Sequence, residues 1–125
     1  MDLNLKEGTL RVAFATTNLE DIDAHFGSTK QFYVYEISKN DFVASKIIQI
    51  TEKNTDLTVQ SLEGIDIVYF SDIGPAAAAK IINSGIFPIK YKDVVTIEEE
   101  VMKIQNMLGS NPPPFIKKII EKKVA

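Results

Sequence analysis

Residues 65–91 have the sequence IDIVYFSDIGPAAAAKIINSGIFPIKY, and this stretch decides the fold class. Its first part, up to Phe70, is apolar at nearly every position, which is typical of a central strand with both faces covered. Gly74-Pro75 predicts the start of a helix, because proline suits a first turn in which its missing N–H has no partner. Gly85 ends that helix, and Pro88 places the following strand near a sheet edge. The stretch therefore predicts a β-α-β unit with parallel strands.

Upstream of this unit, three further β-rich runs and a short helix are predicted. A turn at 39–41 joins the second and third runs as a hairpin. The short helix is capped by Thr55 or Asp56 and closed by Gly64. The predicted strands are residues 10–15, 31–37, 42–50, 65–70 and 86–91.

Downstream of the unit, two more helices are predicted. Thr96 and Glu99 form a capping box for the first, in which each side chain accepts from the other residue's backbone N–H, and Gly109 ends it. The prolines at 112–114 make a stiff spacer. The last helix, residues 115–124, has lysines on most of its surface and one apolar stripe, made of Phe115, Ile116, Ile119 and Ile120.

Length and composition fit one globular domain, since the chain has 125 residues of which 45% are hydrophobic. We expect a flexible tail over 1–9, an α/β domain over 10–109, and the spacer with its helix over 110–125. The net charge of −3 disfavours nucleic-acid binding through overall charge. The absence of cysteine excludes disulfides, thiolate catalysis and cysteine-ligated metals. No signal peptide or bilayer-spanning apolar run is present, so we predict a cytoplasmic protein without membrane contact.

The order of the elements predicts a single-domain α/β fold, with a mixed five-stranded sheet flanked by helices. In open sheets of this class, ligands bind at the carboxyl ends of the strands. The first and fourth predicted strands end in the loop after Ala15 and in the loop over 71–75. We therefore expect these two loops to meet at a crevice.

His25, the only histidine, lies in the long connection after the first strand. A neutral imidazole can ligate a metal or hold a preformed cofactor through one bond, and the alternative is a loop histidine in water or bonded to backbone. Asp21, Asp23 and His25 alternate, so an extended loop would project all three to one side, where they could hold a cation. A solvated acidic loop is the favoured interpretation, because the pattern matches no recognised metal-binding loop.

The helix start at Gly74-Pro75 is followed by four alanines and has little side-chain bulk. Its free N–H groups and dipole could receive an anion, and the alternative is that small residues let the helix pack tightly on its sheet. A hydrolase is disfavoured, because none of the hydroxyls near the crevice belongs to a nucleophile elbow. These hydroxyls are Thr16, Thr17, Ser28, Thr29 and Ser71. The basic residues Arg11, Lys30, Lys80, Lys90 and Lys92 are scattered along the chain.

Seven segments together resemble the nitrogenase iron–molybdenum cofactor biosynthesis family, and most of all its small NifX-type members. Two of these segments, when found together, are fairly specific for this family: DAHFGST at 23–29 and DIGPAAAAKI at 72–81. The others are RVAFAT at 11–16, QFYVY at 31–35, GIFPIK at 85–90, TIEEEV at 96–101 and NPPPF at 111–115. The resemblance extends over residues 10–123.

This resemblance implies a ribonuclease-H-like fold and a domain that binds the dinitrogenase iron–molybdenum cofactor. It implies a non-catalytic carrier that binds this cofactor or its iron–sulfur precursor and passes it between the scaffold and cluster-synthesis proteins of nitrogenase assembly. We expect a monomer or weak dimer. The family's loop histidine corresponds to His25, which would be the sole metal ligand. The implied cargo contacts are His25, Phe26, Gly27, Ser28, Thr29, Lys30, Thr16, Gly74, Pro75 and Ala76.

Other functions are weighed against this carrier. A ribonuclease-H-type nuclease is disfavoured, because it needs carboxylates on its strands to hold two metal ions and the first strand presents Arg11, Ala13 and Ala15. A regulatory module could bind a partner protein through residues 115–124 without any metal. A small-anion or nucleotide-binding domain could use the helix start at Gly74.

Overall fold

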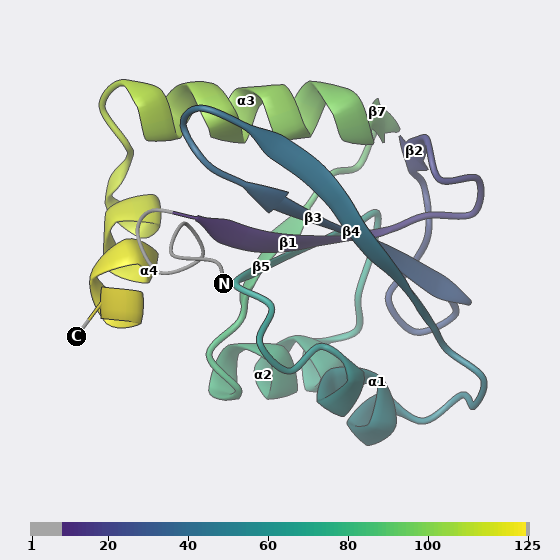
Figure 1. Ribbon diagram of the computed structural model, residues 1–125. Helices are drawn as coiled ribbons and strands as arrows, with labels where there is room; N and C mark the ends of the chain where they lie inside the picture. The colour runs from purple at the N-terminus through teal and green to yellow at the C-terminus, as the bar shows by residue number, and fades with distance from the viewer. Residues whose placement is uncertain (1–8, 125) are drawn as a thin grey trace.

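The central sheet of the protein has five strands, and the computed structural model describes residues 9–124 (Figure 1). The strand order across the sheet is β4-β3-β1-β5-β6. Their bounds are β1 (Leu10–Ala15), β3 (Gln31–Ile37), β4 (Phe42–Gln49), β5 (Ile67–Phe70) and β6 (Phe87–Lys90).

Strand directions confirm the predicted mixed sheet. β3 pairs antiparallel with both β1 and β4, and the pairing with β4 shifts register between Val34 and Tyr35. β5 is parallel to both β1 and β6, as the β-α-β unit predicts. β6 lies at a sheet edge, where Pro88 is tolerated.

Helices cover both faces of the sheet (Figure 1). α1 (Thr55–Ser61) and α2 (Pro75–Asn83) lie below it in this view, and α3 (Ile97–Gly109) runs above it. α4 (Pro114–Val124) follows α3 and packs on the same apolar core through the fully buried Ile116. No helix among residues 9–124 is both long enough and apolar enough to cross a bilayer.

Two apolar cores follow from the alternation of side chains along the strands. On β1, Ala13 and Ala15 face the core under α1 and α2, whereas Val12 and Phe14 face the core under α3 and α4. Every residue of β5 is buried, which confirms that the apolar run before Ser71 is a central strand.

Several local expectations need correction. The connection after Ala15 contains a strand, β2 (Asp21–Ile22), which pairs antiparallel with β7 (Val95–Thr96) in a second small sheet. α1 is capped by Asn54, not by Thr55 or Asp56: the Asn54 backbone is extended, and its side chain accepts from the N–H of Leu57 at 3.1 Å. α4 begins at Pro114, one residue earlier than expected.

The remaining helix boundaries agree with the sequence prediction. The capping box is present, since Glu99 N–H donates to the Thr96 hydroxyl at 3.1 Å and Thr96 N–H donates to the Glu99 carboxylate at 3.1 Å. Gly85 has a φ of +87° after the end of α2, a left-handed conformation that favours glycine. Of the expected N-terminal tail, residues 1–8 lie outside the described residues, and Thr9 is buried.

Candidate functional site

The loop that carries His25 meets the loop that follows β5. Phe26 N–H donates to the Asp72 carbonyl at 2.8 Å, and Ser71 N–H donates to the Ala24 carbonyl at 3.0 Å. His25 and Asp72 thereby form a parallel bridge that continues the pairing of β1 with β5. The prediction that two loops meet at the carboxyl ends of these strands is confirmed.

Residues 25–30 form a tight turn that is held at both ends. The His25 carbonyl accepts from Ser28 N–H at 3.2 Å and from Thr29 N–H at 2.9 Å. Phe26 is 3% exposed and lies 5.8 Å from the Phe32 ring centroid, so its ring anchors the turn in the core. The buried Thr29 hydroxyl donates to the Gln31 carbonyl at 2.8 Å. The side chains of His25, Ser28 and Lys30 remain exposed.

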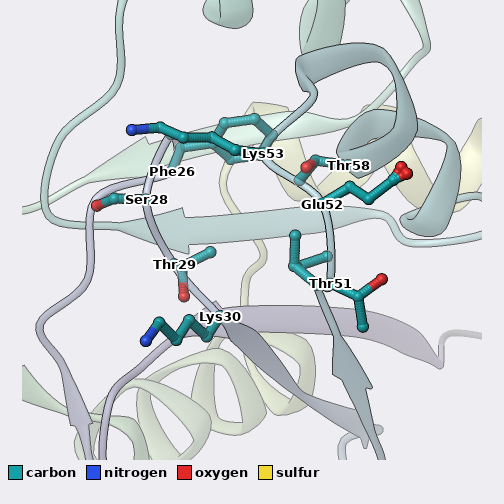
Figure 2. A pocket seen from close by; sticks show the side chains of 10 residues that line it. Phe26, Ser28, Thr29, Lys30, Thr51, Glu52, Lys53 and Thr58 are labelled. Atoms are coloured by element: carbon teal, nitrogen blue, oxygen red, sulfur yellow. The ribbon is translucent and has the colours of Figure 1, made fainter.

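Three hollows surround this turn. The largest, about 550 Å³, has Thr16, His25 and Lys30 in its lining, and a second of about 340 Å³ lies between His25 and Gly74. The third, about 300 Å³, separates the turn from the connection between β4 and α1 (Figure 2). Ser28 lines all three hollows, and His25 lines two of them. The imidazole therefore stands at a junction of accessible space.

Thr16 lines the largest hollow but is itself fully buried. Its hydroxyl accepts from Leu19 N–H at 3.0 Å and from Asn18 N–H at 3.3 Å. These bonds stabilise the turn after β1, in which Leu19 has a φ of +66°. Thr16 therefore shapes the wall of the hollow.

The three alternating residues of the D-x-D-x-H pattern do not converge. Asp23 turns back to Thr17, accepting from its backbone N–H at 2.8 Å and from its hydroxyl at 2.6 Å. Asp21 accepts from the Asn18 side-chain amide at 2.8 Å. Within residues 9–124 no group of three histidine, aspartate or glutamate side chains is placed to hold a metal ion. The carboxylates shape the loop, and the three-ligand cation site is not formed.

Asp72 lines the 340 Å³ hollow with His25, as Asp23 lines the largest one, and the charge of Asp72 is partly neutralised. Its carboxylate accepts from Ile73 N–H at 2.9 Å and lies 3.5 Å from the Lys90 ammonium. The pKa of Asp72 lies below its ordinary value, mainly because of the backbone bond from Ile73. Lys90 contributes next, and His25 contributes to a smaller extent. An anionic ligand in this hollow would therefore face a carboxylate that already has a cationic partner.

The start of α2 contributes less than expected. Gly74 is its N-cap residue and lines the 340 Å³ hollow, and a Cβ added there would meet nothing within 4 Å. Pro75 and Ala76 are exposed but line none of the three hollows. Ala77, the next residue, packs against the core, so at that position the small side chain serves helix packing.

Two contributors to the site were absent from the sequence prediction. Gln31 lines the largest hollow, and its side-chain amide donates to the Thr16 carbonyl at 3.2 Å. Lys53 lines the other two hollows. It lies on the connection between β4 and α1, and no spacing in the sequence relates it to His25.

Comparison with known proteins identifies the family. The sequence model of the family described as dinitrogenase iron–molybdenum cofactor matches residues 8–107. The chain belongs to this family. It is 32% identical to Protein NifX of Rhodobacter capsulatus, over 91% of this chain and 79% of that protein. These matches confirm the NifX-type resemblance within the dinitrogenase iron–molybdenum cofactor family.

Two further matches are a relative that is similar over part of the chain and a solved structure. A segment covering 63% of this chain is 34% identical to the FeMo cofactor biosynthesis protein FixZ of Rhizobium leguminosarum, of which it covers 19%. The crystal structure of PH0822 aligns with a TM-score of 0.64, at 23% identity, over 80% of this chain and 89% of that one. At that identity the structural similarity shows a shared fold alone.

Proposed function

We propose that this protein is a non-catalytic cytoplasmic carrier, which binds the iron–molybdenum cofactor or its iron–sulfur precursor through His25 and passes it between nitrogenase assembly proteins. The observation that carries the proposal is the exposed imidazole of His25 on a firmly held turn, at the junction of two hollows. The chain has no cysteine and no other histidine. The imidazole is thus the strongest ligand available to a soft or borderline metal.

Attachment through one residue suits a carrier better than a storage site. Each additional metal–ligand bond slows dissociation, and most differences in affinity are differences in dissociation rate. A single imidazole bond can be exchanged for a ligand on the receiving protein. The exposed hydroxyl of Ser28 would orient the cargo without adding a strong bond.

Family membership and strand order support the proposal. The family is described by the iron–molybdenum cofactor of dinitrogenase, and one relative is described as a FeMo cofactor biosynthesis protein. A β-hairpin joined to parallel strands that are connected through helices supports the ribonuclease-H-like classification. The alternative of a partner-binding helix at 115–124 loses support, because Ile116 is buried and its apolar neighbours on α4 also pack on the core.

Anaerobic gel filtration with isolated iron–molybdenum cofactor tests the carrier role. We expect wild-type protein to elute with iron, molybdenum and visible absorbance, and His25→Ala to elute without them. Asn40→Ala is the control, because Asn40 is exposed and lines none of the three hollows, and this variant should retain the cargo. Full retention of cargo by His25→Ala at neutral pH contradicts the proposal.

A further inference from the structure

The connection between β4 and α1 forms a second wall of the candidate site. Ile50 N–H donates to the Lys30 carbonyl at 2.9 Å, which ties this connection to the end of the His25 turn. Residues 50–53 then line the 300 Å³ hollow opposite Phe26 and Ser28 (Figure 2). Lys53 extends further, because it also lines the 340 Å³ hollow together with His25 and Gly74.

Lys30 and Lys53 present two cations to the space around His25. Both are exposed, and neither has an ion pair within 4 Å in the described part of the chain. In Figure 2 their ammonium groups end on the side of the hollow where the Ser28 hydroxyl lies, whereas the Glu52 carboxylate extends to the other side. Lys30 shares the largest hollow with His25, and Lys53 shares the 340 Å³ hollow with it. The imidazole is therefore flanked by cations that come from two different segments.

We propose that Lys53 is a second cationic contact for the cargo and acts together with Lys30, so that the site selects a ligand with negative charge on more than one side. This inference rests on the proposed function. A sulfide-rich metal cluster is such a ligand, because its outer sulfides carry negative charge around its whole surface. His25 supplies the bond to a metal, and the two ammonium groups supply attraction that grows with the charge of the ligand. A neutral or singly charged molecule gains little from two separated cations.

The test compares charge reversals at three lysines. Lys53→Glu and Lys30→Glu change the candidate site, and Lys118→Glu makes the same change of net charge on α4, where Lys118 is exposed and lines none of the three hollows. Affinity for isolated iron–molybdenum cofactor is measured anaerobically at about 20 mM and about 500 mM salt. Lys53→Glu should weaken binding at least about fivefold at low salt, and the difference should shrink at high salt because screening shortens the reach of an exposed charge. Lys53→Gln should show a smaller loss in the same direction, and its melting temperature controls for folding.

The outcomes separate this inference from the carrier proposal. Equal affinities of Lys53→Glu and Lys118→Glu at low salt overturn the role of Lys53 while leaving His25 as the anchor. A loss that is the same at both salt concentrations also overturns it, because the effect would then not be electrostatic. A wild-type protein that binds no cofactor refutes the carrier proposal, and the role of Lys53 falls with it.

Discussion

Replacing Phe26 with alanine should destabilise the turn over residues 25–30 and the core beneath it, while replacing its neighbour His25 should not. Phe26 is 3% exposed, and its ring centroid lies 5.8 Å from that of Phe32 and 6.0 Å from that of Phe70. His25 is exposed, and its carbonyl accepts the hydrogen bonds from Ser28 N–H and Thr29 N–H, which an alanine keeps. Two adjacent substitutions in one turn therefore have opposite expected effects on stability.

The size of the effect follows from burial. Deleting a buried phenylalanine ring costs about 3–5 kcal/mol, because the transfer free energy is lost and a cavity remains. An exposed side chain changes the free energy of unfolding by about 0.5 kcal/mol or less. For a domain of this size, a loss of 1 kcal/mol lowers the melting temperature by about 3–5 °C, so Phe26→Ala should melt at least about 10 °C lower than wild type. His25→Ala should melt within about 2 °C of wild type.

Thermal and urea unfolding, each followed by circular dichroism, measure the two variants against wild type. Phe26→Leu is the control, because it keeps an apolar group of similar reach and should lose much less stability than the alanine variant. A Phe26→Ala protein as stable as wild type would show that the ring does not anchor the turn. Equal destabilisation by His25→Ala would show that the imidazole has a structural role, and the reasoning that assigns it to cargo would fail.

Two further predictions concern helix starts. Ala76→Leu should leave the melting temperature nearly unchanged, because Ala76 is exposed. Ala77→Leu should overpack the core, lowering the free energy of unfolding by about 1–3 kcal/mol and the melting temperature with it. Thermal unfolding of both variants checks this, and equal losses of stability contradict it. The Thr96 N–H and hydroxyl lower the pKa of Glu99, so its charge stabilises the fold above the unfolded pKa and this contribution is lost as pH falls through the folded pKa. The advantage of wild type over Glu99→Gln in urea unfolding should therefore shrink from pH 6 towards pH 3, and an advantage that does not depend on pH contradicts it.

The parts of the fold that sequence predicts are those specified locally. Of the predicted strand 65–70, residues 67–70 form the buried strand β5, in which every position is apolar. The capping box forms because Thr96 and Glu99 are three residues apart. β2 and β7 have two residues each, which is too short for any periodicity, and they pair across more than half of the chain. β4 has strand-like residues but is exposed at every position except Ile48, because it lies at the sheet edge, so its pattern predicts the strand and not its burial.

The candidate site shows the same division. Local sequence patterns predict the strands and their order, and from that order it follows that the loop with His25 meets the loop after β5. Asp23 lines the largest hollow together with His25, but its carboxylate accepts from the backbone N–H and the hydroxyl of Thr17, which an extended loop does not predict. Lys53 is brought to the site by the pairing of β4 with β3 and by the bond between Ile50 and Lys30, which join segments that are distant in sequence. Contacts of this kind depend on the tertiary fold and leave no local signature.

The backbone bond between Phe26 and Asp72 fixes the main chain next to His25, whereas the imidazole is exposed. The side chain can therefore move on a faster timescale than the loop that carries it. Rotation of an exposed side chain takes picoseconds to nanoseconds, whereas movement of a loop extends to microseconds. Before cargo binds, the exposed imidazole can turn between the two hollows it lines while every main-chain hydrogen bond of the turn stays intact. The rate of handover between proteins would then be limited by breaking the bond between metal and nitrogen, and not by any rearrangement of the carrier.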